Sequence, residues 1–394
     1  MKQMKFVGVL MAGILVSCSS GNLKEEGKKT SQAPVLKEAN TIKAELPAAI
    51  KNEEEWQLQK SVSDEFNYSF KAENNKAYFG EGKKWVNFYH SNWDGPGTTY
   101  WKYNHVEVEG GDLVIKSSRW KQSEELNPIS RKPNKMNKPL GGINAGCISS
   151  VDKVVYPVFI ESKSMVANIV LASDVWLLSP DATQEIDIME CYGGKEPGNS
   201  YFAKSIHVSH HSFIRKPFTD YQPRDKGAWY QREGVTGWGE YCWNNGERRD
   251  VRTGVYWKSP VHFEHYIDGE LIRVLHDKAV ATKIKGVWEY GYPTMTDGKL
   301  DVAYGKQKIT ITNTTTEYSF AELEKANEIS EVSIIDPYEY QNGNGYTKPL
   351  NIIINLESQD WHVKADRTPT DEDLKNPDKN QMKVDWIRVY KPKQ

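Results

Sequence analysis

The sequence contains few cysteines, little net charge and only a short apolar run at its N-terminus. Its 394 residues include 4 cysteines, too few for disulfide bonds to carry a fold of this size. The 51 basic residues nearly balance the 53 acidic ones, and the formal net charge of -2 excludes a general nucleic-acid-binding surface. We therefore expect no nucleic acid partner, although a few local arginines could still hold a sulfated glycan.

The N-terminal residues predict export. Lys2 and Lys5 precede an apolar run over 6–16 that is too short to span a bilayer as a mature helix. The run ends in Leu15-Val16-Ser17-Cys18, which resembles a bacterial lipobox with cleavage before Cys18. We therefore expect a signal peptide over 1–17 and a lipid anchor on Cys18 at the outer membrane or cell surface. The alternative is an ordinary cleaved secretory signal.

The next segment, 18–55, is rich in Lys, Glu, Ala, Ser and Asn and contains few large apolar residues. It cannot bury enough surface to offset the entropy of ordering, so we expect a flexible tether. Without Cys18 an odd number of cysteines remains, and we expect free, mostly buried thiols at Cys147, Cys191 and Cys242. We find no repeat and no second change of composition, so 56–394 is interpreted as one catalytic domain.

Short runs of β-branched and aromatic residues, separated by Gly, Asn, Asp and Pro, predict an all-β sandwich from Trp56 onward. The strand regions that we expect are 106–116 with a turn at Gly110-Gly111, 154–166, 254–274 with a turn at Asp268-Gly269, 350–356 and 383–390. We expect helices only at 319–329 and, capped by Thr370, at 371–374. The 13 Trp and 21 Tyr provide faces for sugar stacking or for a packed core.

One strand carries three acidic residues in the segment Glu185-Ile-Asp187-Ile-Met-Glu190. In a regular strand Glu185 and Asp187 share a face and Glu190 points to the other. A β-bulge between Asp187 and Glu190 would bring all three to one face. The pattern alone is also compatible with a solvated strand face or a calcium site. Retaining glycosidases require two carboxyl groups about 5–5.5 Å apart, which a kinked strand could supply.

The residues around this strand, 172–194, closely resemble the catalytic strand of β-agarases in family 16 of the glycoside hydrolases. Further segments resemble agarase segments in the same order and cover nearly the whole chain after Trp56. These are His90-Ser-Asn-Trp93-Asp-Gly-Pro-Gly97, Asn144-Ala-Gly-Cys147-Ile, 207–215, Tyr266-Ile-Asp-Gly269, 352–357 and Val384-Asp-Trp-Ile-Arg-Val-Tyr390.

The resemblance implies a β-jelly-roll sandwich of two curved antiparallel sheets with an open concave substrate groove. It implies retention of configuration, with Glu185 as nucleophile, Glu190 as acid/base and Asp187 as an auxiliary group. Asp187 could share a proton with the nucleophile, and a neighbouring negative charge would raise the pKa of Glu190. No cofactor is expected for catalysis. A structural calcium ion is common in the family, and Asp64 and Asp385 are weak candidates to hold it.

Several side chains are candidates for substrate binding. His207 and His211 share a strand face near the carboxylates, and a metal site in the histidine cluster is the less favoured interpretation. Trp93 follows a polar loop and is expected to stack on a sugar ring on the non-reducing side, whereas Trp176 could equally belong to the core. The remaining candidates match groove positions of the agarase pattern: Asn144, Arg215, Glu357, Trp361 and Arg119, the last being a candidate for sulfate recognition.

Two loops depart from the agarase pattern. The segment 121–140 is longer than expected, and 229–252 adds Trp238, Tyr241 and Trp243. We expect such loops to extend the groove. The main hypothesis is a monomeric endo-β-agarase that cleaves β-1,4 bonds of agarose or a related red-algal galactan into neoagaro-oligosaccharides. The alternatives are a porphyranase acting on sulfated agar and a non-catalytic surface glycan-binding lipoprotein.

Overall fold

The computed structural model describes residues 50, 55–91, 93–121, 142–244 and 247–393. The signal peptide, Cys18 and the loop over 122–141 lie outside the described residues. Ile50 is buried against Phe159 and Tyr266, so ordered packing begins before Trp56, the expected domain boundary. No described helix has the length and apolar character needed to cross a membrane.

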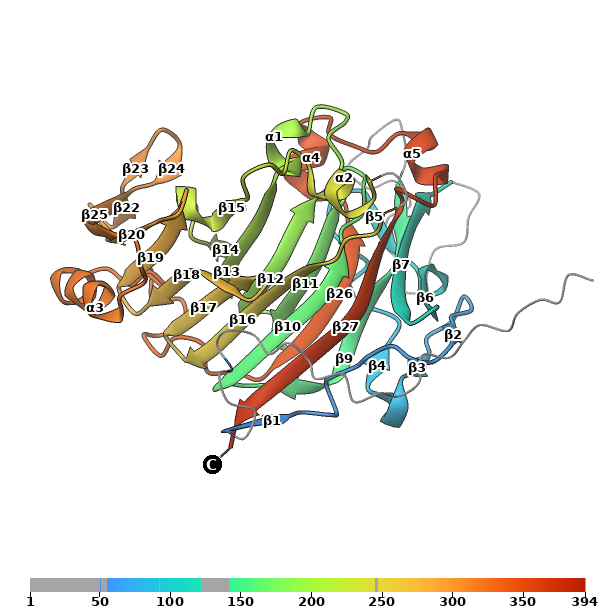
Figure 1. Ribbon diagram of the computed structural model, residues 1–394, viewed down its shortest axis with the longest axis horizontal. Coiled ribbons are helices and arrows are strands. Elements are labelled where there is room, and N and C mark those ends of the chain that lie inside the picture. Colours follow the sequence, from blue (N-terminus) through green and yellow to red (C-terminus); the bar gives the residue numbers. More distant parts are fainter. Residues whose placement is uncertain (1–49, 51–54, 92, 122–141, 245–246, 394) are drawn as a thin grey trace, which may run out of the picture. The chain divides into compact units, whose positions relative to one another are not determined.

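Two large sheets make up the described part of the domain (Figure 1). Within the described residues the larger sheet has 14 strands, with β2-β6-β7-β27-β10-β16-β17-β18-β19-β20-β25 as its main order. Its strands are β1 (Trp56–Leu58), β2 (Phe70–Lys71), β5 (Thr99–Trp101), β6 (Val106–Glu109), β7 (Asp112–Arg119), β8 (Ile143–Ala145), β10 (Val158–Met165), β16 (Val251–Ser259), β17 (His262–Ile267), β18 (Glu270–His276), β19 (Ala279–Ile284), β20 (Val287–Pro293), β25 (Ile309–Thr315) and β27 (Gln381–Pro392).

The smaller sheet has 9 described strands, with β14-β13-β12-β11-β26-β9-β4-β3 as its main order and β15 paired to β13. Its strands are β3 (Tyr78–Phe79), β4 (Trp85–Val86), β9 (Cys147–Val154), β11 (Ala172–Leu178), β12 (Gln184–Tyr192), β13 (Ser205–Arg215), β14 (Phe218–Tyr221), β15 (Trp229–Gln231) and β26 (Leu350–Glu357). Among the described pairings only β5 with β8 is parallel. The two open antiparallel sheets confirm the expected β-jelly-roll.

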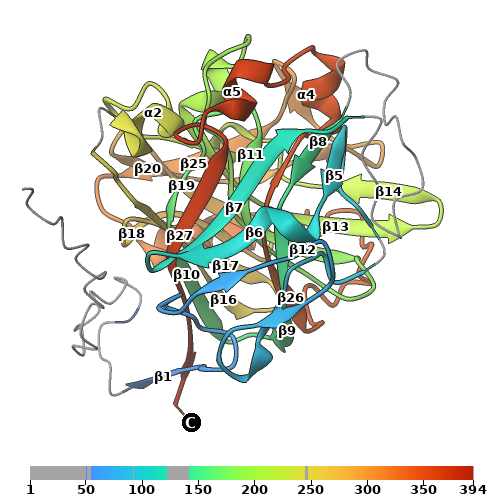
Figure 2. The same cartoon turned by 90° about the vertical axis from the view of Figure 1, so that its right-hand side faces the viewer.

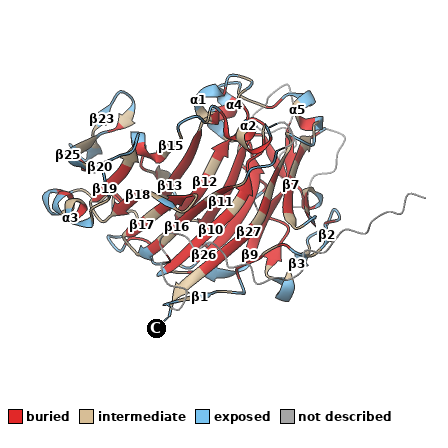
Figure 3. Ribbon diagram, in the orientation of Figure 1, coloured by how far each residue is buried: buried red, intermediate tan, exposed pale blue. Residues whose placement is uncertain are grey.

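The core is built from buried residues of both sheets. Figure 2 shows the arrangement of the strands from the side, and Figure 3 shows buried positions along the strands of both sheets. On β12, Ile186, Ile188 and Cys191 are fully buried in this core. The free thiols of Cys147, Cys191 and Cys242 are also buried, as predicted. The β12 side chains between these apolar positions therefore face the other way, toward the outer surface of the smaller sheet.

Short elements surround the sheets. The two helices expected from the sequence are present: α3 (Phe320–Ile329), capped by Ser319, and α5 (Asp371–Lys375), capped by Thr370. Short turns of helix that have no apolar periodicity were missed. These are α1 (Ser200–Ala203), α2 (Trp238–Cys242), α4 (Asp360–Lys364) and the 3₁₀ turns η2 (Glu81–Lys83), η3 (Tyr103–His105) and η5 (Lys226–Ala228). Two small hairpins follow β20: β21 (Met295–Thr296) with β22 (Lys299–Leu300), and β23 (Val302–Ala303) with β24 (Lys306–Gln307).

Candidate active site

The acidic strand β12 contains the bulge predicted from its sequence. Opposite β13, its register shifts between Asp187 and Glu190. Opposite β11, Asp187 and Met189 pair with the adjacent residues Trp176 and Val175, which leaves Ile188 as the extra residue. The bulge places Glu185, Asp187 and Glu190 on one face, where all three line the same cavity.

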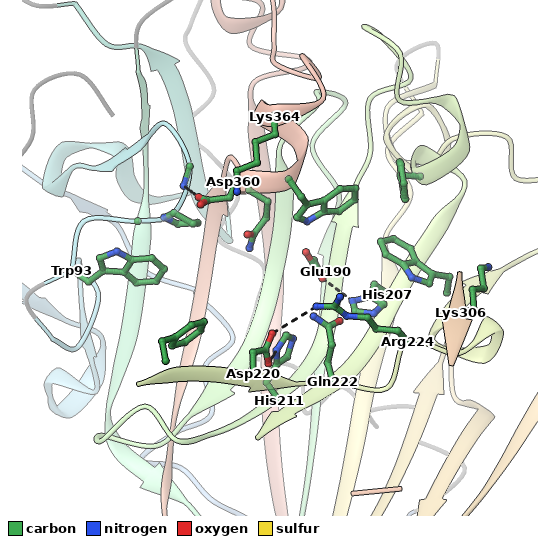
Figure 4. Close-up of a pocket in the computed structure, with 18 of the residues that line it drawn as sticks. Trp93, Glu190, His207, His211, Asp220, Gln222, Arg224, Lys306, Asp360 and Lys364 are labelled. Atoms are coloured by element: carbon green, nitrogen blue, oxygen red, sulfur yellow. Dashed lines mark hydrogen bonds and ion pairs between the residues drawn. The ribbon is translucent and has the colours of Figure 1, made fainter. Parts of the chain in front are cut away.

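That cavity is part of a groove across the smaller sheet. Two adjoining cavities of about 1380 and 570 Å³ share Trp93, Glu190 and His211 among their lining residues. Strands β11, β12, β13 and β26 form the floor, and the loop over 93–97, helix α4 and the β14 region form the walls. Figure 4 shows Glu190 between Trp93 on one side and Lys306 on the other. The space is long enough for a chain-like ligand to cross the acidic strand.

Two donors contact the carboxylate of Glu190. Nδ1 of His207 lies 2.7 Å from Oε2, and the Tyr192 hydroxyl donates to Oε1. The His207 ring stacks on Trp229 with 4.4 Å between ring centroids. Burial alone would raise the pKa of Glu190, but the hydrogen bonds from His207 and Tyr192 lower it below its usual value. Our expectation of a raised pKa was wrong, because it considered neighbouring charge and not these donors.

Glu185 and Asp187 share a different partner, His211. Its Nε2 lies 3.5 Å from Oδ2 of Asp187 and 3.8 Å from Oε1 of Glu185, while its Nδ1 lies 2.8 Å from Oδ1 of Asp220. Burial lowers the pKa of His211, but Glu185 and Asp220 outweigh it and raise that pKa to about 10. His211 is therefore a cation at neutral pH, which offsets part of the repulsion among the carboxylates.

The two carboxyl groups beside His211 resist full ionisation. Burial and then the Asp187 charge raise the pKa of Glu185 well above its usual value, and burial raises that of Asp187 to about 6. These groups titrate as a pair, so they do not both ionise readily. The carboxylates and His211 also have the composition of a cation site, with ligand atoms within 4.8 Å of one another.

A buried network continues the polar floor onto β11 and β26. The Trp176 indole donates to Oδ1 of Asn355 at 2.7 Å, and Nδ2 of Asn355 donates to Oδ2 of Asp174 at 2.9 Å and to Oε2 of Glu357 at 3.1 Å. Burial, followed by repulsion from Glu190, raises the pKa of Glu357 to about 8. A protonated Glu357 provides a hydrogen-bond donor at the groove, which suits a sugar hydroxyl.

Aromatic side chains line the groove at a distance from the carboxylates. Trp93 is 42% exposed and packs edge-on against Trp101, with ring centroids 5.3 Å apart. Trp361 is 37% exposed on α4. Arg215 lines the cavity with its guanidinium 4.6 Å from the Phe213 ring centroid. Because Trp93 and Trp361 are partly exposed at the groove, each can offer part of its ring to a sugar.

The structure brings most of the candidate residues together. Lining the two cavities are Glu185, Asp187, Glu190, Trp93, Trp176, His207, His211, Arg215, Glu357 and Trp361.

Arg119 and Asn144 do not line the groove. Arg119 donates through Nε to Oδ1 of Asp371 at 2.7 Å and through a terminal nitrogen to the Pro369 carbonyl at 2.8 Å. Asn144 is buried and donates to Oγ of Ser118 at 3.2 Å. The pattern placed both on the correct sheet edge, but it did not reveal these partners.

One further expectation is corrected in part by burial. Trp238 and Trp243 are 0% and 8% exposed, so they reinforce the core and do not wall the groove, whereas Trp229 of the same segment lines it. The weak calcium candidates are occupied by protein partners. Asp64 accepts from Phe66 N at 3.0 Å, Tyr68 OH at 3.0 Å and Trp85 Nε1 at 2.8 Å, and Asp385 pairs with Lys163 at 2.7 Å. Structural calcium stays a prediction.

The sequence analysis missed several residues of the site. Tyr192 follows Glu190 by two positions on the same strand, so strand periodicity alone could have indicated it. The others depend on strand register and long-range packing: Asp174, Asp220, Trp229, Asn355 and Gln359.

Comparisons with known proteins agree with this geometry. The family model described as "Beta-porphyranase A-D, GH16 domain" matches residues 56–318. Beta-agarase D of Zobellia galactanivorans is 43% identical over 88% of this chain and 73% of its own length. A β-agarase of Phocaeicola plebeius is 36% identical over 98% of this chain and 97% of its own length.

Solved structures show the same relationship. The crystal structure of the catalytic domain of the Zobellia β-agarase D matches with a TM-score of 0.74 and 42% identity, covering 86% of this chain and 95% of that one. The family model covers the acidic strand, and the relatives and the solved structure each match 86% or more of the chain. The chain therefore belongs to family 16 of the glycoside hydrolases.

Proposed function

We propose that this protein is a retaining endo-hydrolase that cleaves β-1,4-galactosidic bonds in agarose and releases neoagaro-oligosaccharides. The observation that carries the proposal is the bulged strand β12, which presents Glu185, Asp187 and Glu190 together on the floor of a long groove. Relatives at 36% and 43% identity over most of the chain are named β-agarases, which supports agarose as the substrate.

In this proposal Glu185 attacks the anomeric carbon while Glu190 protonates the departing glycosidic oxygen. A covalent glycosyl-enzyme results, and Glu190 then removes a proton from the water that hydrolyses it. Cationic His211 stabilises ionised Glu185, and the paired Asp187 takes the proton that Glu185 must lose before it attacks. No metal ion or cofactor is required by these steps.

The carboxylate of Glu190 changes its surroundings when substrate binds. Glu190 and His207 are joined by a hydrogen bond of 2.7 Å. In the free groove the hydrogen bonds from His207 and Tyr192 stabilise ionised Glu190. A sugar bound above the pair excludes water and brings an oxygen acceptor, which favours the neutral acid and its transfer of the proton.

Glu185→Ser tests the assigned chemistry. We expect turnover of agarose to fall by about 10⁴-fold or more, since the attacking group is removed. Binding of an agarose oligosaccharide should remain measurable by calorimetry, because the aromatic and polar walls are intact. Glu233→Gln, an exposed position outside the groove, is the matched control and should leave turnover unchanged. Appreciable turnover by Glu185→Ser would contradict the role, and a parent protein without activity would favour a non-catalytic glycan-binding lipoprotein.

The second candidate is a porphyranase, which the name of the matching family model favours. A sulfated galactose needs a cationic contact in the groove, and the candidate cation Arg119 is instead bound to Asp371. Product sizing after incubation with agarose and with porphyran separates the two functions. Release of oligosaccharides from porphyran alone would replace the agarase proposal.

The location proposed for this activity is the outer membrane or cell surface, with the chain anchored through a lipid on Cys18 and acting as a monomer. The lipobox-like sequence that ends at Cys18 supports the anchor. An anchored enzyme with a long groove would act on polymer outside the cell.

A further inference from the structure

A second cavity adjoins the groove on the side opposite Trp93. Its volume is about 330 Å³, within the range of sugar-sized sites. Segments far apart in the sequence form it, and the lining residues are Tyr201, Lys204, Lys226, Gly227, Trp229, Tyr230, Gln231, Ile272, Thr282, Lys283, Ile284, Lys285 and Lys306. We call it the lysine pocket.

The lysine pocket is lined by five lysines and no acidic residue. Only Lys283 forms an ion pair within the described part of the chain, with Glu270. Lys204 lies over the Tyr201 ring, 5.3 Å from its centroid, and Nζ of Lys306 lies 3.5 Å from the Tyr201 hydroxyl. The formal net charge of the whole chain is -2, so this accumulation of positive charge is local. A cavity lined by several ammonium groups and no carboxylate is suited to an anionic ligand.

The pocket is continuous with the groove. Trp229 and Lys306 line both cavities, and Figure 4 shows Lys306 beyond His207 on the side away from Trp93. Trp229 stacks on His207, which contacts Glu190. A sugar chain that crosses Glu190 and passes Trp229 therefore reaches the lysines next.

We propose that the lysine pocket binds an anionic substituent, a sulfate ester or a carboxylate, on a galactan chain whose neutral part occupies the groove. The inference rests on the proposed function, because it takes the groove to hold a galactan. Lys226 and Lys285 are exposed, and each carries its ammonium group on a long flexible side chain. Such a group acts as a point charge, so the pocket can accept anionic substituents of different shapes. The enzyme would then hydrolyse neutral agarose and bind partly charged galactan more tightly.

Binding to the Glu185→Ser form tests this without hydrolysis. Calorimetry would compare an agarose octasaccharide, its O-sulfated form and a form carrying pyruvate acetals. We expect both anionic forms to bind more tightly than the neutral one, and Lys226→Gln with Lys285→Gln to reduce that preference by about tenfold, since exposed charge contacts each contribute a small factor. The preference should also shrink as salt increases.

The matched control is Lys60→Gln with Lys71→Gln, two exposed lysines outside the groove, which should leave the preference unchanged. A preference for the sulfated form alone would identify the substituent as sulfate. The proposal is overturned if the anionic forms bind no better than the neutral one, if the lysine substitutions leave the ratio unchanged, or if inorganic sulfate competes as well as the sulfated octasaccharide. Failure of the parent protein to cleave agarose would overturn the proposed function separately, because these measurements need no turnover.

Discussion

At the scale of single residues, the hydrogen-bond and charge partners of Glu185 and Glu190 give the two carboxyl groups different pKa values. Glu190 receives hydrogen bonds from His207 and Tyr192, which lower its pKa. Glu185 has a cation nearby and no such donor, and burial keeps its pKa high. Chemically identical side chains five positions apart thus acquire different proton affinities. In the free groove their order is opposite to the one that a nucleophile and an acid require, so protons must move when substrate binds.

His211→Gln should shift the pH dependence of the reaction. The His211 cation lowers the pKa of Glu185 and of Asp187, so its removal raises both. Fewer molecules then carry an ionised nucleophile at a given acidic pH. We expect the acidic limb of the kcat/KM profile to move up by about one unit, while activity persists on its alkaline side.

The control for this profile is His105→Gln, a histidine that contacts Asn104 and Ser118 outside the groove. It should leave the acidic limb in place. If the acidic limb of the His211→Gln profile stays in place or moves to lower pH, His211 does not stabilise the ionised nucleophile.

At the scale of elements, the groove depends on contacts between loops distant in sequence. The backbone N–H of Gly97, next to the Trp93 loop, donates to Oδ1 of Asp360 on α4 at 2.6 Å. A Cβ at Gly97 would lie 2.0 Å from the Ser358 carbonyl oxygen, so only glycine fits there. Because helix α4 also carries Trp361, this contact holds Trp361 in a defined position relative to Trp93.

Gly97→Ala should separate the Trp93 loop from α4. We expect KM for agarose oligosaccharides to rise several-fold, with a smaller effect on kcat because the acidic strand is untouched. Gly298→Ala is the control, since its φ of +69° is equally unusual for alanine but nothing lies within 4 Å of the added Cβ. Equal kinetic effects of the two substitutions would contradict the proposed contact.

The sequence predicted the strands and helices better than the side-chain contacts between them. The bulge in β12 followed from the need to bring Glu190 to the face of Glu185, and the caps of α3 and α5 followed from Ser319 and Thr370. Arg119 and Trp238 could not be assigned, because their contacts depend on distant segments. Asp220 lies only nine residues from His211, but their contact depends on the register between β13 and β14. Local periodicity reports which face a residue occupies, and it does not report which side chain lies opposite.

At the scale of the whole molecule, residues 46–394 form one compact unit by their contacts. A chain that starts at Leu46 retains Ile50, which packs against Phe159 and Tyr266. We expect this shortened chain to match the full chain in kcat/KM and in Tm, because the groove and core are complete within it.

Cys18→Ser in the full chain is the companion variant. It should move the protein from the membrane fraction to the soluble fraction with kcat unchanged, as loss of the proposed lipid anchor requires. Retention in the membrane fraction would contradict the anchor, and a shortened chain of low Tm would place part of the folding unit before Leu46.

The position of β27 constrains the order in which the domain can fold. This strand, Gln381–Pro392, lies between β7 and β10 in the larger sheet and also pairs with β1. Until β27 joins them, β7 and β10 expose strand edges that have no native partner, and such edges promote aggregation. The larger sheet therefore cannot be completed before residues 381–392 are available to it.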